Sequence, residues 1–155
     1  RGFAKEGWKA LKTLSDTALN FETSRIYPGI PEYFRADGRG VYHYLTGAAS
    51  WYMLTMVTES FGVHGKAGDL VLYPKLLSEQ FDEKGRASIT TQFADKTFQI
   101  HYDNPNQKDF GKYIIKKATC DNKEIEITDD AFAFITKADL ANLNDEVHEI
   151  IITLD

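Results

Sequence analysis

The chain has 155 residues, 43% of them hydrophobic and 13% aromatic, which is enough to bury the core of one domain or of one domain and part of another. Its net charge of -5 and its lack of basic runs disfavour binding to nucleic acid or to an anionic membrane surface. The single cysteine, Cys120, excludes an internal disulfide and fits a reducing compartment, so we expect a cytoplasmic protein. No apolar run approaches the ~20 residues of a membrane span.

The first expected element is an amphipathic helix over residues 3–19, because apolar residues recur at spacings of three and four. Residues 22–40 contain Pro28, Pro31 and three glycines, which predict a structured loop instead of a continued helix. Its aromatic residues argue against disorder, and loops of this length usually have a function. The chain starts without methionine and enters the helix at once, so we expect a piece of a longer protein.

A second helix is expected over residues 48–61, AASWYMLTMVTESF. It is apolar around most of its circumference, which predicts a helix buried on nearly all sides.

After GVHGKAG the pattern changes to short, partly alternating runs separated by the turn signals DEKG, DNPN and DN. Such runs predict an antiparallel β-sandwich, and the whole chain is expected to be α+β. We place the boundary after residue 65, with residues 1–65 helical and residues 66–155 a β domain. The predicted strands are residues 70–72, 87–93, 97–102, 113–119, 124–127, 131–135 and 147–154.

The stretch YHYLTGAASW, residues 42–51, leads into the second helix. Thr46 is placed to cap the first turn, where the unpaired N–H groups and the helix dipole also favour an anion. Gly47 lacks a Cβ at that position, so a small anion could approach the backbone. Local physics leaves both interpretations open, a plain cap and an anion site.

Two other residues are candidates for ligand binding. His43 could donate to an anion or satisfy a loop carbonyl, and Glu32 could accept hydrogen bonds from sugar hydroxyls or pair with Arg35 or Arg39. The remaining histidines have no ligand-like spacing, so no metal site is expected. The β region shows no catalytic constellation.

Residues 27–61, YPGIPEYFRADGRGVYHYLTGAASWYMLTMVTESF, and the following GVHGKAGDLVLYPKLLSEQFD resemble the C-terminal part of glycoside phosphorylases of glycoside hydrolase family 94. The family includes cellobiose, cellodextrin, chitobiose and β-1,2-oligoglucan phosphorylases. The motifs PEYF, GRG, LTGAASW and GDL…PKL occur in the family's order and at similar separations. The similarity covers residues 1–105 and is looser beyond them.

The resemblance implies that residues 1–65 are the last helices and an active-site loop of a catalytic α/α barrel, and that residues 66–155 are a jelly roll. It implies inverting phosphorolysis of β-glucosidic oligosaccharides to an α-sugar 1-phosphate, without a cofactor, since inorganic phosphate is a co-substrate. The family's LTG motif contributes to phosphate binding and matches Leu45, Thr46 and Gly47; Ala48 stands where Ser or Thr is frequent. Glu32 and His43 are the expected substrate-binding residues, and a homodimer is the expected assembly of the full-length enzyme.

The family's general acid and its phosphate-binding Arg and His lie upstream of these residues, so the resemblance implies that the chain by itself is inactive. A hydrolase is the enzymatic alternative to a phosphorylase. Two non-enzymatic interpretations also stay open, a structural domain and a non-catalytic carbohydrate-binding domain of a glycoside hydrolase. A carbohydrate-binding domain requires aromatic side chains exposed along one sheet face, for which the candidates are Tyr73, Phe93, Phe98, Tyr102 and Tyr113.

Overall fold

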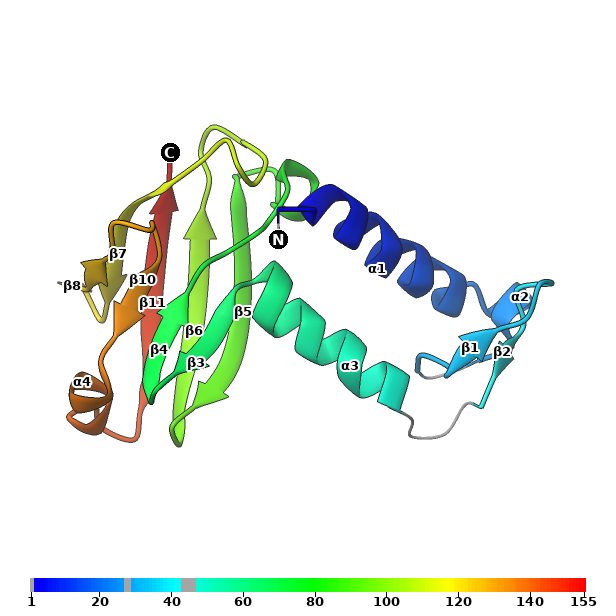
Figure 1. Ribbon diagram of the computed structural model, residues 1–155, viewed down its shortest axis with the longest axis horizontal. Coiled ribbons are helices and arrows are strands. Elements are labelled where there is room, and N and C mark those ends of the chain that lie inside the picture. Colours follow the sequence, from blue (N-terminus) through cyan, green and yellow to red (C-terminus); the bar gives the residue numbers. More distant parts are fainter. Residues whose placement is uncertain (1, 27–28, 43–46) are drawn as a thin grey trace. The chain divides into compact units, whose positions relative to one another are not determined.

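The computed structural model describes residues 2–26, 29–42 and 47–155. The chain divides into two compact units, Arg1–Met56 and Val57–Asp155. Helices and a short hairpin form the first unit, and two β-sheets form most of the second (Figure 1). The expected α+β class is therefore confirmed. The boundary expected after residue 65 falls inside strand β3 (Val63–Lys66), which belongs to the second unit.

The first unit begins with the expected amphipathic helix, α1 (Ala4–Leu19), followed by the short helix α2 (Phe21–Ser24). The fully buried Ser24 joins these elements. Its hydroxyl donates to the Ala18 carbonyl at 2.9 Å and accepts the Ile26 N–H at 3.2 Å. These two bonds hold the chain that leaves α2 against the end of α1.

The expected loop over residues 22–40 contains a small antiparallel hairpin, β1 (Tyr33–Phe34) and β2 (Gly40–Val41). Gly38 lies in its turn with a φ of +81°, a conformation that L-residues with side chains rarely adopt. A Cβ on Gly40 would lie 2.4 Å from Cγ1 of Ile26, so only glycine fits there. The glycines of the GRG motif region thus have a structural role in packing the hairpin.

The second expected helix is present as α3 (Gly47–Thr55), which continues as a π-helical turn, η1 (Met56–Ser60). The prediction that this helix is buried on nearly all sides is wrong for this chain, because no α3 residue is buried. Trp51 and Met53 are 69% and 63% exposed. Other described residues do not cover the whole apolar circumference of α3.

The second unit consists of a four-stranded sheet and a five-stranded sheet. In sheet order, the four-stranded sheet comprises β3, β4 (Asp69–Leu72), β10 (Ala133–Ile135) and β9 (Glu126–Ile127). The five-stranded sheet comprises β5 (Arg86–Phe93), β6 (Lys96–Asp103), β11 (Val147–Leu154), β7 (Ile115–Cys120) and β8 (Lys123–Glu124). A 3-10 turn, η2 (Ser78–Gln80), and a short helix, α4 (Lys137–Ala141), lie in the connections.

One strand pair differs from the antiparallel arrangement that the sequence predicted. Strand β11 runs parallel to β6 and antiparallel to β7, whereas every other pairing among the described strands is antiparallel. The last strand therefore inserts into the middle of the five-stranded sheet instead of adding to its edge.

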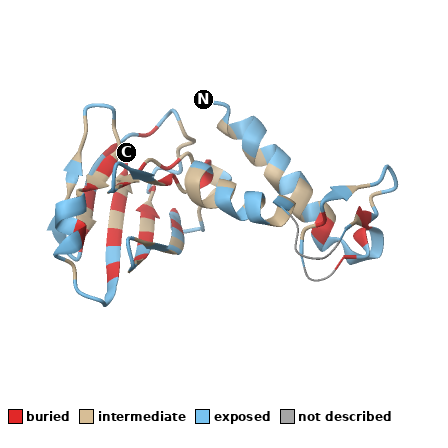
Figure 2. Cartoon of the chain, turned by 60° about the horizontal axis from the view of Figure 1, so that its bottom comes forward, coloured by how far each residue is buried: buried red, intermediate tan, exposed pale blue. Residues whose placement is uncertain are grey.

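The inner faces of the two sheets share one hydrophobic core. Side chains such as Leu70 and Leu72 from β4 and Ile100 and Ile150 from β6 and β11 are fully buried. Buried positions alternate with more exposed ones along the long strands, as Figure 2 shows, because successive side chains of a strand point to opposite faces. Among the helices of the described residues, none is long and apolar enough to cross a membrane.

Candidate functional site

The strongest candidate site lies in the first unit, where the hairpin β1–β2 meets the start of α3. The residue before β1, Glu32, donates its backbone N–H to the carbonyls of Val41 and Tyr42, both at 3.2 Å. These bonds fix the position of Glu32 across the hairpin. Its side chain is then directed to the first turn of α3, where its Oε2 accepts the Ala48 N–H at 3.4 Å.

The contact between Glu32 and Ala48 joins two of the sequence motifs, PEYF and LTGAASW, across a separation of 16 residues. An amide in the first turn of a helix has no intrahelical partner and lies at the positive end of the helix dipole, so it attracts a negative group. In this structure the carboxylate of Glu32 is that group. Glu32 therefore already marks the start of α3 as a position that accepts negative charge.

Gly47 is the first residue of α3 and leaves the site uncrowded. A Cβ placed on it would meet only Cδ1 of Trp51, at 3.9 Å, which is an ordinary van der Waals contact. Packing within the described chain therefore does not require glycine here, in contrast to Gly40. Access of a ligand to the backbone is therefore a candidate role for Gly47.

Two aromatic side chains lie beside Glu32. The rings of Tyr33 and Tyr42 pack edge to face, with their centroids 5.8 Å apart, and each residue is about half exposed. Tyr42 has a φ of +56°, which is uncommon for a bulky residue and is a form of local strain that often occurs at binding sites. The pair gives the site an apolar wall with polar tips.

One of the two arginines that the sequence offered as partners of Glu32 pairs with another carboxylate of the hairpin. The guanidinium of Arg35 lies 3.8 Å from the carboxylate of Asp37. Asp37 also accepts the backbone N–H of Arg39 at 3.2 Å. The carboxylate of Glu32 is instead positioned by its hydrogen bond with the helix amide.

The structure brings together Glu32 and Gly47 among the predicted site residues. His43 and Thr46 lie outside the described residues, so their assignment to ligand binding stays a prediction from sequence. No group of three or more potential metal ligands occurs among the described residues. The arrangement that is described offers a helix amide, a carboxylate and aromatic faces, which suit an oxyanion and the hydroxyls of a sugar.

In the second unit, three of the five aromatic candidates for an exposed sheet face are core residues, and core packing is the role that the sequence favoured for most of them. Phe98 and Tyr102 are fully buried and Tyr113 is 9% exposed. Tyr113 has an internal role, since its hydroxyl accepts the Leu76 N–H at 2.9 Å. These side chains belong to the core between the sheets.

Sequence spacing also missed two histidine contacts in the β unit. His101 lies 2.7 Å from the Ser88 hydroxyl, and His148 lies 2.7 Å from the carboxylate of Asp121. Both contacts join residues on different strands or turns, so no local pattern could reveal them. Cys120 is buried in β7, and burial, with the nearby Asp121 charge, raises the pKa of its thiol to about 11. It is an unreactive thiol at neutral pH.

No protein-family model matches the chain, and a search of curated proteins finds no significant match.

Proposed function

We propose that this chain is the C-terminal part of an inverting glycoside phosphorylase, which cleaves β-glucosidic oligosaccharides with inorganic phosphate to give an α-sugar 1-phosphate. In this proposal the first unit contributes the last helices of an α/α barrel and one wall of the catalytic site. The two-sheet unit is the C-terminal jelly roll. The remainder of the barrel and a second copy of the full-length enzyme are its protein partners.

The contact between the Glu32 carboxylate and the Ala48 N–H is the observation that carries the proposal. It joins the two motifs that the resemblance assigns to the sugar and to phosphate, at a helix start that attracts negative charge. The uncrowded position of Gly47 supports the same assignment. A plain helix cap would need neither the glycine nor a carboxylate from a separate loop.

The proposed reaction transfers a glucosyl group to phosphate. A phosphate oxygen attacks the anomeric carbon from the face opposite the leaving group, so the β bond is replaced by an α bond. The bond to the leaving oxygen breaks, and a carboxylic acid from the preceding part of the barrel protonates that oxygen. Thr46 and Gly47 hold the phosphate, and Glu32 and His43 orient the sugar. No cofactor takes part.

Glu32 and phosphate compete for the same helix start in this proposal. A carboxylate 3.4 Å from the Ala48 amide repels an incoming phosphate anion. Glu32 therefore turns to the sugar hydroxyls when both substrates bind, which releases the amide for phosphate. This exchange makes phosphate binding stronger when the sugar is present.

The test uses the full-length gene product with a panel of β-linked glucose disaccharides, with and without phosphate. Release of α-sugar 1-phosphate that depends on phosphate supports the proposal. Release of free sugars at the same rate without phosphate identifies a hydrolase and overturns it. The 155-residue chain is assayed in parallel and is expected to release no sugar 1-phosphate, because the acid lies outside it.

A further inference from the structure

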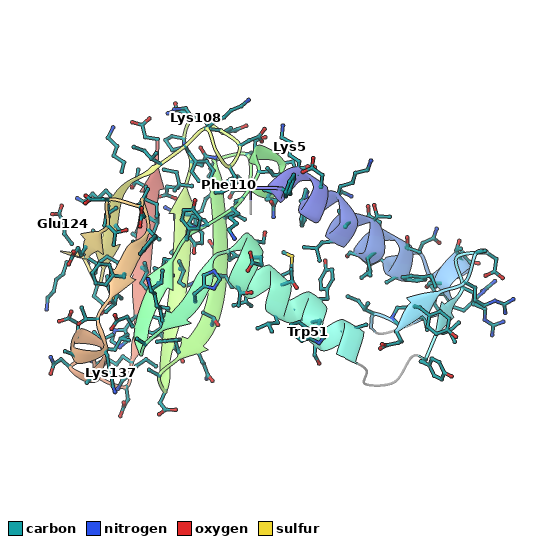
Figure 3. The ribbon with its side chains drawn as sticks, in the orientation of Figure 1. Lys5, Trp51, Lys108, Phe110, Glu124 and Lys137 are labelled. Atoms are coloured by element: carbon teal, nitrogen blue, oxygen red, sulfur yellow. The ribbon has the colours of Figure 1, made fainter. Side chains whose placement is uncertain are left out.

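A pocket lies in the second unit, outside the candidate site described above. It has a volume of about 350 Å³ and is bordered by the β7–β8 hairpin, β9, the end of β10 and α4. Figure 3 labels Glu124 on β8 and Lys137 at the start of α4, on either side of this region. The volume lies within the range of small-molecule sites, roughly 300–1,000 Å³.

The pocket combines an apolar floor with polar groups at its rim. Phe134, Ile135 and Leu143 contribute the apolar surface. Phe134 lies directly opposite Glu126 in the β9–β10 pair, so the ring and the carboxylate are neighbours. An aromatic ring beside a hydrogen-bonding group is a common arrangement for binding the apolar and polar faces of one ligand.

Most carboxylates at the rim already have partners. Asp121 contacts His148 at 2.7 Å, Glu124 lies 3.5 Å from Lys117, and Asp139 accepts the Thr136 hydroxyl at 2.6 Å. These groups are held by the fold and have reduced capacity for a ligand.

Three lining side chains remain without a hydrogen bond or ion pair to any described residue: Lys123, Glu126 and Asn142. They comprise a cation, a carboxylate and an amide, so together they carry no net charge. They offer both donors and acceptors. The lining as a whole holds four carboxylates and one lysine, which disfavours a phosphate ester, and the donors and acceptors of these three side chains suit a ligand rich in hydroxyl groups.

We propose that this pocket binds one pyranose ring of a neutral saccharide. The ring's C–H face lies on Phe134 and Leu143, and its hydroxyls bond to Glu126, Asn142 and Lys123. The pocket needs neither phosphate nor a catalytic acid, so the inference stands apart from phosphorolysis. In a saccharide-processing enzyme it would be an accessory site that holds the chain of a substrate.

The test is a titration of the ¹⁵N-labelled 155-residue protein with methyl β-D-glucopyranoside and with cellotriose, without phosphate, followed by NMR. We expect the backbone amides of residues 120–126 and 134–143 to shift with millimolar dissociation constants. Asn142→Ala and Glu126→Gln should each weaken binding about tenfold, because the first removes the side-chain amide and the second replaces a charged acceptor with a neutral amide. Both residues are exposed in the free protein, so the variants are expected to fold. Glu83→Gln, an exposed change in the turn before β5, should leave binding unchanged.

Absence of shifts with either saccharide overturns the inference, and so do shifts that both pocket variants retain at full affinity. Stronger binding of 1,5-diaminopentane or inorganic phosphate at the same amides overturns it as well, since the pocket would then select charge. A titration without shifts does not contradict the proposed phosphorolysis, and an inactive full-length enzyme does not contradict saccharide binding in this pocket.

Discussion

Nδ1 of His148 lies 2.7 Å from Oδ2 of Asp121, and this contact ties the central strand β11 to the β7–β8 turn. His148 is nearly fully buried and also contacts the Asn144 carbonyl through Nε2, at 3.2 Å. Asp121 has a second bond, since its Oδ1 accepts the Glu149 N–H at 2.9 Å. Asp121 therefore bonds to both the side chain of His148 and the backbone of β11, so the protonation of this pair affects how the β7–β8 turn is held against β11.

We expect this pair to make stability depend on pH. Burial lowers the pKa of His148, but the bonds to Asp121 and Asn144 and the Asp121 charge outweigh burial and Lys96, so the pKa is raised. The stabilisation is therefore fully present below the unfolded-state pKa of about 6.5 and is lost as pH rises through the folded-state value. Burial raises the pKa of Asp121, but its hydrogen bonds lower it further, so its contribution is lost in acid, below about pH 3.9.

The measurement is urea unfolding of the protein and of Asp121→Asn, from below about pH 3.9 to above the folded-state pKa of His148. Asparagine, like aspartate, tolerates the φ of +49° at this turn position. We expect it to be less stable by about 1.5–3 kcal/mol near pH 5, with a smaller difference at alkaline pH. A difference that does not change with pH would contradict the assignment. Asp129→Asn, at an exposed position, is the matched control.

Gly47→Ala separates ligand binding from folding. The added methyl group meets only Trp51 at 3.9 Å, and alanine favours a helix over glycine by up to about 1 kcal/mol. We expect an unchanged or higher melting temperature, measured by circular dichroism, together with an increase of about tenfold in the KM of the full-length enzyme for phosphate. An unchanged KM for phosphate would remove Gly47 from the phosphate site.

Gly62→Ala is the contrasting control. Gly62 has a φ of +69°, and a Cβ there would lie 1.9 Å from the carbonyl oxygen of Tyr73. We expect a loss of more than about 2 kcal/mol in the free energy of unfolding.

Tyr102→Phe tests a buried hydrogen bond. The Tyr102 hydroxyl donates to the carbonyl of Phe61, and the side chain is fully buried between the sheets. Phenylalanine fills the same volume but leaves that carbonyl without its partner. We expect a loss of about 1–3 kcal/mol in urea unfolding, with an unchanged slope. A neutral result would mean that water replaces the hydroxyl.

The β5–β6 turn offers a stabilising change. Ala94 and Asp95 have φ angles of +49° and +60°, the left-handed values of a type I′ turn, for which Asn-Gly is preferred. We expect the double variant Ala94→Asn and Asp95→Gly to raise stability by about 1 kcal/mol, because it removes unfavourable left-handed backbone. A lower urea midpoint would show that the turn is not of this type in solution.

The exposed apolar side chains of α3 predict self-association of the isolated chain. Trp51 and Met53 expose large apolar side chains, and burial of apolar surface contributes about 25 cal/mol per Å². We expect light scattering to show a mass that rises with concentration, and Trp51→Gln with Met53→Gln to reduce it. A clean monomer that binds no hydrophobic dye would contradict this expectation.

Much of the local structure follows from sequence pattern. The helix expected over residues 3–19 is α1, and the runs at 97–102 and 147–154 become the central strands β6 and β11. The turn signal DN marks a turn in which Asp121 and Asn122 both have positive φ. These successes share a cause, since period and turn chemistry are properties of neighbouring residues.

The failures concern features that distant residues decide. The sequence pattern places VHGK, residues 63–66, in a connection, but it forms β3 because Val63 and His64 pair with β4. The parallel alignment of β6 and β11 depends on residues about 50 positions apart and has no local signature. At the candidate site, the sequence predicted Glu32 and Gly47 as separate site residues. That they lie close together at the start of α3 depends on how the hairpin folds, which the sequence pattern does not show.

The central place of β11 has a consequence for synthesis on the ribosome. Strands β6 and β7 are made first, and each keeps an unpaired edge until residues 147–154 have emerged and inserted between them. The five-stranded sheet therefore cannot close until residue 154 has emerged. A nascent chain that stalls before residue 147 exposes two strand edges to neighbouring chains, so premature termination should produce aggregates instead of a smaller folded domain.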